Sequence, residues 1–410
     1  MEEGSKGDLF LVDDLLIQIL VWLPVISLLR FKTVCKSWRS IIQSSDFIHR
    51  HATFNNDDNK TGTLIFQSSH CIKEMGKDMG RFYVPHFFVL SSCSSNGWLY
   101  KYLGVPPYPR GEPLARFELS GQVLERHRPV TMVASCHGII CMHDIFPRDI
   151  ALWNPATKHF RVLPKSLPLP EVFGKLQEDY VGFGFDTETK DYKVLLITYD
   201  ATKMKNAVQV YSMRTNSWRW CVDVDLPATR CFSRDVHNQG VYLNGHYLFI
   251  ATKFYTTFEE GESHNCSETV VISFDFSKES YTIIPAPTDD VRLDVRGRDG
   301  KIVCFTYLLP DDRKCQVYAL NNDTLQNEDS WTKLYETGMD QSHSCLGPMA
   351  ISKDGLCGFL RGSDGYGLMS YNLETEERKD IRLANVSYRD VVVQRAQIYK
   401  ESLVSVYPPS

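Results

Sequence analysis

The sequence predicts a small all-α module of three helices followed by an all-β propeller, with six blades as the first count and seven or eight as alternatives. Three observations support this fold class. The stretch from Leu11 to Ile42 is rich in large apolar residues at helical spacing. From Thr61 onward, short β-branched and aromatic runs alternate with turn residues. A strand-and-hairpin pattern recurs in this second region, which is typical of propeller blades.

The 410 residues divide into four parts. Residues 1–8 form a polar tail that we expect to be disordered, and residues 9–50 form the helical module. Residues 51–60 form a linker, because Asn55–Lys60 is too poor in apolar residues to pack. Residues 61–410 form the propeller. With 43% hydrophobic residues, the chain can build more than one folded domain.

Three short helices follow one another in the N-terminal module. The first has apolar residues at four-residue steps, namely Leu11, Leu15, Ile19 and Leu23. Pro24 cannot continue that helix but can begin the next, which reaches Phe31. Val34 and Trp38 begin the apolar side of the third helix. Apolar residues lie on more than one face of the first helix, so part of its surface points away from the small shared core.

This module carries more large apolar side chains than a piece of roughly 40 residues can bury on itself. The run from Leu15 to Leu29 contains Gln18 and Pro24 and is shorter than the roughly 20 apolar residues of a spanning helix. A secretory signal is excluded because Asp13 and Asp14 precede the run, where basic residues are required. The surplus marks either a protein interface or a contact with the rest of the chain, and the residues alone leave both open.

The same stretch resembles the F-box, the module that joins substrate receptors to SCF-type ubiquitin ligases. The matching pieces are Asp13-Asp14-Leu15, Ile19-Leu20, Leu23-Pro24, Ser27–Lys32, Val34–Ile42 and Phe47-Ile48. The resemblance implies that a Skp-type adaptor covers the surplus apolar surface. The residues that match adaptor-contacting positions are Leu11, Leu15, Ile19, Leu23, Pro24, Leu28, Val34 and Trp38. The family usually has Leu-Pro at its start, whereas this chain has Leu11-Val12, which weakens the expected contact.

The composition argues against several function classes. A net charge of −5 gives no overall attraction to nucleic acid or to an anionic membrane. Cys136 and Cys141 are the nearest two of the 12 cysteines, and we expect them on opposite faces of one strand, which does not suit a zinc site. We therefore expect no metal and no cofactor. Free thiols and no secretory signal favour the cytoplasm or the nucleus.

Six repeats begin at a turn residue that an apolar strand follows: Gly97, Gly138, Asp191, Gly245, Gly300 and Gly355. In each repeat an aromatic residue later ends an alternating strand, a polar turn follows, and a second strand begins. Three of these hairpins have aromatic residues seven positions apart, namely Trp153 and Phe160, Tyr211 and Trp218, and Phe274 and Tyr281. We expect Thr63–Phe66 and Ser402–Val406 to share a blade and close the ring. The alternative is a β-sandwich with chance periodicity.

Pieces of this region resemble the F-box-associated, kelch-like domain of plant F-box proteins. They are Ser135–Cys141, Leu152–Thr157, Gly182–Asp186, Asp191–Val194 and Tyr399–Val404. Several also resemble the S-locus F-box proteins of pollen, which recognise stylar ribonucleases in self-incompatibility. With the F-box, the resemblance covers nearly the whole chain and implies a propeller that holds a target protein.

Three segments interrupt the blade pattern and are candidates for target binding: 165–179, 255–268 and 337–348. The middle one carries Glu259, Glu260 and Glu262, which favour a basic partner. We find no nucleophile elbow and no phosphate loop, which argues against an enzyme. Gly182-Phe183-Gly184 lacks a third glycine and a following helix, and it fits a strand edge with close backbone approach.

The sequence thus predicts the substrate-recognition subunit of an SCF-type ubiquitin ligase. The F-box would bind a Skp-type adaptor, and through it a cullin, while the propeller binds a target protein. Such a receptor is not an enzyme, since it acts by raising the effective concentration of the target near ubiquitin. One alternative is a propeller scaffold that no longer engages the adaptor, which Val12 leaves open. A propeller enzyme is the other.

Overall fold

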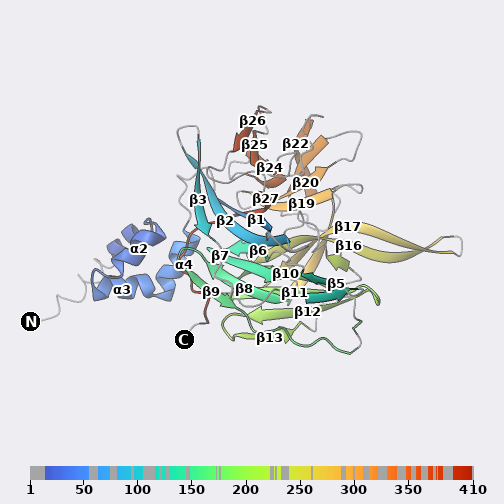
Figure 1. The fold of residues 1–410 in the computed structure, drawn as a ribbon, viewed down its shortest axis with the longest axis horizontal. Coiled ribbons are helices and arrows are strands. Elements are labelled where there is room, and N and C mark those ends of the chain that lie inside the picture. Colours follow the sequence, from blue (N-terminus) through green and yellow to red (C-terminus); the bar gives the residue numbers. More distant parts are fainter. Residues whose placement is uncertain are drawn as a thin grey trace, which may run out of the picture.

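The computed structural model consists of a small helical module at one end of a larger β region (Figure 1). The structure describes residues 14–54, 63–73, 81–93, 97–104, 116–119, 122–125, 130–144, 148–171, 173–174, 177–221, 226, 229–231, 240–259, 262–287, 292–298, 301–307, 314–321, 330–338, 348–351, 357–361, 368–372, 375, 377–381 and 391–408.

The N-terminal module contains four helical segments where three were expected. Residues 14–20 are helical and precede α2 (Val25–Phe31), α3 (Lys36–Gln43) and α4 (Ser45–Thr53). Pro24 stands immediately before α2, as expected from its position. The Cys35 sulfur accepts a hydrogen bond from the Trp38 N–H at 3.4 Å, and the Ser44 hydroxyl accepts one from the Phe47 N–H at 3.2 Å. The Ser44 cap lets the chain change direction and start α4 only two residues after α3 ends.

α4 extends three residues into the range expected for the linker. His51 and Ala52 are buried there, and the His51 Nε2 atom lies 3.0 Å from the Leu23 carbonyl oxygen. The helical module therefore ends near Thr53, with α4 as its packed boundary toward the β region.

The described strands form six sheets of four or five strands and one two-stranded ribbon, with antiparallel pairing throughout. One sheet pairs β27 (Val391–Ile398), β1 (Leu64–Lys73), β2 (Arg81–Cys93) and β3 (Gly97–Gly104); the next contains β6 (Thr131–Cys136), β7 (Ile139–Asp144), β8 (Asp149–Asn154) and β9 (His159–Val162). The third contains β10 (Gln177–Asp186), β11 (Asp191–Asp200), β12 (Lys205–Ser212) and β13 (Ser217–Trp220). The fourth contains β14 (Thr229–Cys231), β15 (Val241–Leu243), β16 (His246–Glu259), β17 (Glu262–Asp275) and β18 (Ser280–Pro285).

The fifth sheet contains β19 (Arg292–Arg298), β20 (Lys301–Tyr307), β21 (Lys314–Leu320) and β22 (Trp331–Gly338), and the sixth contains β23 (Pro348–Ile351), β24 (Cys357–Arg361), β25 (Leu368–Asn372) and β26 (Arg378–Ile381). The ribbon is β4 (Arg116–Leu119) and β5 (Gln122–Glu125). One strand of each sheet contacts one strand of the next in a closed order, β27, β6, β10, β15, β19, β23 and again β27. This closed order is what a β-propeller requires.

The sheet that joins the two ends of the β region differs from the expected one. β1 pairs with β27, from Leu64 opposite Ile398 to His70 opposite Val391. Ser402–Val406, which was expected to supply the second strand, forms no strand and is mostly buried. Its alternating sequence suits a strand, but the strand position is already occupied by Val391–Ile398.

The hairpin predictions hold at three places in the ring. Trp153 lies opposite Phe160, and Phe274 opposite Tyr281, each as a direct cross-strand pair. Tyr211 and Trp218 pair in the same way, with ring centroids 5.4 Å apart. The first predicted repeat is wrong, because the strand at Gly97 is β3, the outer strand of the sheet that joins the chain ends.

Four of the predicted repeat starts lie at or just before the beginning of the second strand of a sheet, and Gly245 precedes β16, which follows β14 and β15, so each repeat contains at least one more strand than expected. At one of them, His137 and Gly138 have φ angles of 45° and 77° and connect β6 to β7. Asn244 and Gly245, with φ angles of 47° and 89°, connect β15 to β16. Two consecutive residues with positive φ are typical of the tight turn that suits a twisted hairpin.

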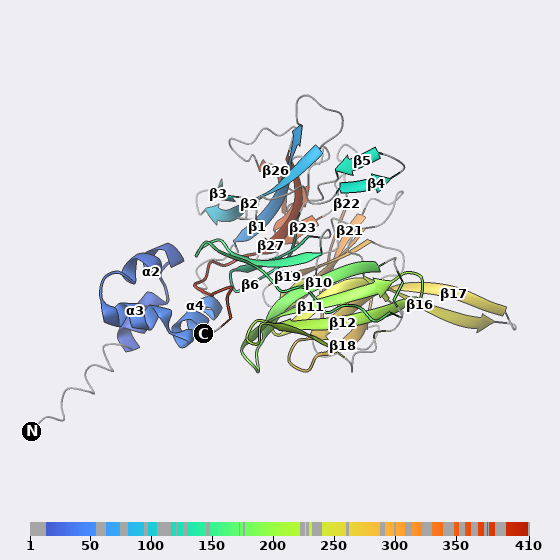
Figure 2. The ribbon, with the colours of Figure 1, turned by 60° about the horizontal axis from the view of Figure 1, so that its bottom comes forward.

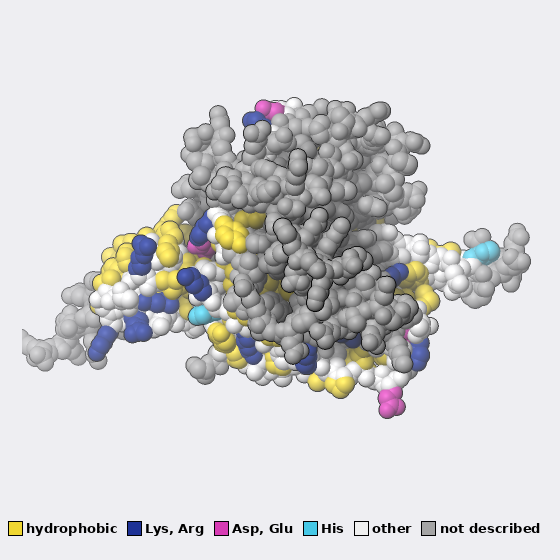
Figure 3. Space-filling view, viewed as in Figure 1, with side chains coloured by type: hydrophobic (Ala, Val, Ile, Leu, Met, Phe, Trp, Pro, Cys, Tyr) yellow, Lys and Arg dark blue, Asp and Glu magenta, His cyan; other side chains and the backbone are white. Residues whose placement is uncertain are grey.

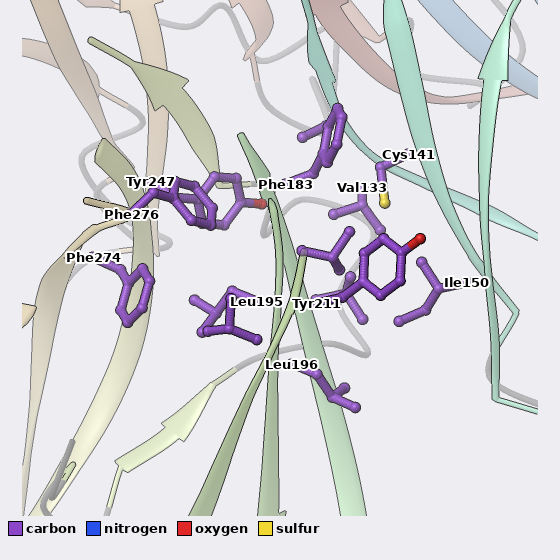
Figure 4. Close-up of a cluster of buried hydrophobic side chains, with 14 of the residues drawn as sticks. Val133, Cys141, Ile150, Phe183, Leu195, Leu196, Tyr211, Tyr247, Phe274 and Phe276 are labelled. Atoms are coloured by element: carbon purple, nitrogen blue, oxygen red, sulfur yellow. The ribbon is translucent and has the colours of Figure 1, made fainter. Parts of the chain in front are cut away.

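A large apolar core lies between neighbouring sheets (Figure 4). It includes Phe183 and Leu195 from the third sheet and Tyr247 and Phe274 from the fourth, all fully or almost fully buried. A Cβ atom at Gly182 would lie 2.6 Å from the Tyr247 ring, so the close approach expected at this glycine is confirmed, here to a side chain. The sheets therefore pack tightly against one another, as blades must because none covers its own faces.

Candidate functional site

A row of exposed apolar side chains lies on the helical module. Leu15, Ile19, Trp22, Ile26 and Val34 are each between 55% and 62% exposed. Figure 3 shows hydrophobic side chains gathered over this module, among lysines and arginines. Exposed apolar patches of this kind usually mark protein interfaces. We call these five residues the apolar row.

The module buries its other apolar face on a core of its own. Leu20, Val21, Val25, Leu28, Ile42 and Phe47 are at most 5% exposed and pack together. Leu28 was expected to contact a partner, but it is fully buried and belongs to this core. α2 is only seven residues long, so small changes in its rotation decide which side chain faces inward, and the sequence does not fix that rotation.

A seventh core residue comes from the other end of the chain. Leu403 is 5% exposed and packs in the same cluster as the helical residues. It belongs to residues 399–408, which we call the C-terminal strap. In Figures 1 and 2 the C-terminus lies beside α4, in agreement with this contact. The helical module is thus completed by a segment that the chain reaches only after the last sheet.

Polar contacts hold the C-terminal strap to both parts of the protein. On the helical side, the Lys400 ammonium group donates to the carbonyl oxygens of Ala52, at 3.2 Å, and Phe54. On the β side, the Asn154 amide donates to the carbonyl oxygens of Ser402 at 3.0 Å and Val404 at 2.8 Å. The strap therefore connects α4 to the end of β8.

The turn between β6 and β7 also contacts the strap. The Ser402 hydroxyl donates to the His137 carbonyl oxygen. A Cβ atom at Gly138 would lie 2.7 Å from the Lys400 carbonyl oxygen, so a side chain here would displace the strap. Gly138 is needed both for its positive φ angle and for this close approach.

An aromatic cluster lies where α4 meets the β region. The His49 ring stacks on Phe185 of β10 at 5.4 Å between centroids. The His137 ring lies edge-on to Phe185 at 5.1 Å, and its Nδ1 atom is 3.1 Å from the Tyr192 hydroxyl. Burial, together with the nearby His49 and Lys400, lowers the pKa of His137 to about 4. At neutral pH this ring is uncharged and acts as a packing group.

The opposite end of the molecule carries a long projecting hairpin, β16 and β17, which we call the arm (Figures 1 and 2). The two strands pair without interruption from His246 opposite Asp275 to Glu259 opposite Glu262. The segment 255–268, expected to be a loop, is therefore β-structure, because its β-branched and aromatic residues pair across the hairpin. Glu259 and Glu262 lie at the end of the arm, and Glu260 lies outside the described residues.

Comparison with known proteins places this arrangement in a family. Residues 9–50 match the F-box domain, and residues 115–410 match the F-box associated beta propeller domain. The chain belongs to the F-box associated propeller family. An F-box/kelch-repeat protein of Arabidopsis thaliana is 28% identical over 300 residues, which cover 73% of this chain and 68% of that protein. A second from the same plant is 25% identical over 356 residues, covering 82% and 73%.

Among solved structures, TolB from Acinetobacter baumannii superimposes with a TM-score of 0.43 at 11% identity, covering 88% of this chain and 72% of TolB. No helix in the described part of the chain is long and apolar enough to cross a membrane.

The predicted F-box positions fall into three groups. Leu15, Ile19 and Val34 belong to the apolar row, and Pro24 is also exposed. Leu23 and Trp38 are half-buried, with Trp38 edge-on to Phe31 at 5.2 Å. Leu28 is buried, and Leu11 and Val12 lie outside the described residues.

Sequence reasoning missed two members of the apolar row. Trp22 and Ile26 are 55% and 56% exposed; Trp22 follows Ile19 by three residues, and Ile26 follows Trp22 by four. That spacing was visible in the sequence. Ile26 was overlooked because Pro24 divides the two helices, and residues on either side of a break are not expected to share one face. Trp22 precedes Pro24 and was overlooked because the four-residue steps of the stripe lead from Ile19 to Leu23.

The remaining candidates are placed as follows. In segment 165–179, the Leu167 N–H donates to the Gln209 side chain at 2.8 Å, and the Gly174 N–H donates to Asp200 at 2.5 Å, so this segment is bound to the third sheet. Most of segment 337–348 lies outside the described residues. Cys136 and Cys141 lie on neighbouring strands and not on one strand, and no group of three possible metal ligands exists among the residues that the structure describes.

Proposed function

We propose that this chain is the substrate-recognition subunit of an SCF-type ubiquitin ligase. In this proposal the F-box binds a Skp-type adaptor, and through it a cullin, while the propeller binds a target protein. The observation that carries the proposal is the apolar row on the F-box. Five large apolar side chains in water are costly to leave uncovered, since full burial of one is worth roughly 1.5–3 kcal/mol.

The adaptor site would consist of the apolar row together with residues beside it. The proposed adaptor-binding residues are Leu11, Leu15, Ile19, Trp22, Leu23, Pro24, Ile26, Val34 and Trp38. Leu28 would act indirectly, by holding α2 in the F-box core. The side chains of the row need no rearrangement to be covered, because they are already outside the core.

The propeller would present the target at a defined position relative to the adaptor. Two observations support this part of the proposal. The C-terminal strap contacts both the F-box and the β region through Leu403, Lys400 and Asn154. The arm, with Glu259 and Glu262 at its end, lies far from the F-box in both ribbon views (Figures 1 and 2). We propose that the target binds on the arm and is basic.

We also propose that each of the six sheets is one blade of a six-bladed ring. The closed order of contacts, with one strand from each sheet, supports this count. The sheet that contains β1 and β27 would be the closing blade, because it joins both ends of the β region.

Co-expression of the full chain with a Skp-type adaptor tests the proposal. The expected result is a stable complex of the two proteins that also captures a cullin. If the folded chain purifies without the adaptor, the ligase function is wrong and a propeller scaffold replaces it.

The finer forms of the proposal have their own tests. The S-locus resemblance suggests a stylar ribonuclease as target and hence a role in self-incompatibility, which binding of such a ribonuclease to the purified complex would test. The receptor has no catalytic role in this proposal and acts in the cytoplasm or nucleus, where imaging of a tagged chain should find it.

A further inference from the structure

The outer half of the arm has sheet edges that no other described strand covers. On the β16 side, β15 covers His246–Leu248 and β14 covers Ala251–Lys253. On the β17 side, β18 covers Val270–Asp275. Beyond these limits, Phe254–Glu259 and Glu262–Thr269 pair only with each other in the described part of the chain, apart from the pairing of Glu268 with Lys253 and of Thr269 with Thr252.

The bare edge of β17 has a local cause. β18 ends at Pro285, opposite Val270, and Ala286 and Pro287 follow it. Proline fixes φ near −65°, far from the roughly −140° of an antiparallel strand, so this segment does not continue along β17. The arm therefore extends from the sheet as two strands alone, an arrangement that is only marginally stable in water without a further strand.

The direction of the free backbone groups follows from one hydrogen bond. The Phe276 N–H donates to the Gly245 carbonyl oxygen at 3.0 Å, so the backbone of residue 276 faces β16. The direction of the backbone N–H and C=O groups alternates from one residue to the next along a strand, and the pairing of β17 with β16 is unbroken from Asp275 to Glu262. Even-numbered residues of β17 therefore face β16, whereas Asn265 and Ser267 direct their N–H and C=O groups outward.

The outward edge lacks most of the features that usually protect an edge strand. Native proteins protect such edges with charged side chains, lysine above all, or with proline or a bulge. From Glu262 to Thr269 the sequence has no lysine, arginine, proline or glycine, and the arm has no register shift. The uncovered stretch is also longer on β17 than on β16, which makes β17 the better edge for an added strand.

Charge defines the chemistry of the occupant. Between Phe254 and Ser277 the sequence has glutamates at 259, 260, 262 and 268 and no lysine or arginine. Glu268 forms an ion pair with Lys253 at 2.7 Å, and the sequence from 254 to 277 supplies no lysine or arginine to balance the other three glutamates. A strand laid along β17 would pass beside an acidic end, so it must be basic to bind well.

We propose that the outward edge of β17, from Glu262 to Thr269, is a docking edge for a basic, extended segment of a partner protein. The segment adds to the arm as a third strand, with backbone hydrogen bonds to Asn265 and Ser267 supplying affinity and the acidic end supplying selectivity. The inference rests on the proposed function in that the partner is taken to be the target of the ligase.

A labelled peptide that alternates lysine with threonine, matched in length to the free edge, is the probe. It is titrated into the full chain bound to the Skp-type adaptor and followed by fluorescence anisotropy. Asn265→Pro removes an outward N–H and leaves the β16–β17 ladder intact, so peptide affinity should fall roughly tenfold. Thr256→Pro makes the same change at the paired position on the opposite edge and should leave the affinity unchanged.

Peptide variants test the mode of binding without altering the protein. N-methylation of alternate peptide amides should abolish binding, and replacing lysine by glutamate should do the same. If the N-methylated peptide binds as tightly as the unmodified peptide, binding depends on charge alone and not on backbone hydrogen bonds, and the proposal is wrong. The proposal would also be overturned by an Asn265→Pro protein that binds as well as the wild type, a peptide that does not bind, or a dimer of the chain that Asn265→Pro dissociates.

The same samples separate this inference from the proposed function. Adaptor capture is measured in every preparation, because the arm and the F-box are at opposite ends of the molecule (Figure 1). A chain that binds the peptide but not the adaptor contradicts the ligase function alone. A chain that holds the adaptor but shows no strand addition contradicts the docking edge alone.

Discussion

Replacing Leu403 by alanine should destabilise the F-box, although the residue lies more than 350 positions away from it in the chain. Leu403 is 5% exposed and packs against the cluster that contains Leu20, Leu28 and Phe47. Removing a buried leucine side chain loses its transfer free energy and leaves a cavity, together about 2–5 kcal/mol. The loss should fall on the F-box and its junction with the propeller.

Urea unfolding and hydrogen exchange would measure this effect. We expect a lower free energy of unfolding and faster amide exchange in α2, α3 and α4, with the exchange of β10 and β11 unchanged. Ile398→Ala is the matched control, because Ile398 is 47% exposed and its truncation should change stability by less than about 0.5 kcal/mol. If Leu403→Ala leaves both measurements at the wild-type values, the C-terminal strap is not part of the F-box core.

Two further predictions concern buried polar groups. Lys193 forms ion pairs with Asp186 at 2.8 Å and Glu279 at 2.9 Å between two sheets, so Lys193→Met should destabilise the protein by about 3–5 kcal/mol in thermal or urea unfolding; an unchanged stability would contradict this. Burial would raise the pKa of Asp186, but hydrogen bonds from Lys193 and its neighbours outweigh it and hold the pKa below its usual value, so this stabilisation is complete above about pH 4 and is lost as the pH falls below it. The pKa of His137 is lowered to about 4 in the folded chain, so between about pH 6.5 and pH 4 the unfolded chain binds a proton that the folded chain does not. The free energy of unfolding should therefore decrease as the pH is lowered from about 6.5 to about 4. Asparagine tolerates the positive φ angle at this position, so His137→Asn should make the melting temperature depend less steeply on pH in this window. If the dependence is as steep as in the wild type, other groups cause it.

Much of this architecture is readable from local sequence. The aromatic residues seven apart form the predicted cross-strand pairs because two short strands and a tight turn fix the register by themselves. The F-box stripe at Leu15 and Ile19 is exposed as its spacing indicated. In both cases the information lies within a few residues of the feature.

The features that were not predicted depend on distant parts of the chain. Ser402–Val406 alternates like a strand, yet β27 occupies the closing position. Leu403 of this segment packs in the F-box core, and Val404 and Val406 pack in the core of the β region. Leu28 faces the core and not a partner because Leu403 and Ile42 are there to pack with it. The arm is an exception, since it is a local hairpin; its segment 255–268 was expected to be a loop because it interrupts the blade pattern.

The central claim is that the apolar row binds the Skp-type adaptor, and one affinity comparison tests it most directly. Ile19→Glu places a charge on a residue that is 62% exposed, so the chain should remain folded with an unchanged melting temperature. Met204→Glu makes a comparable change at a propeller residue that is 44% exposed. We expect calorimetry to find adaptor binding lost or weakened at least about a hundredfold in Ile19→Glu and unchanged in Met204→Glu, since charged groups are depleted in the core of an interface. Wild-type affinity in a folded Ile19→Glu chain would contradict this claim.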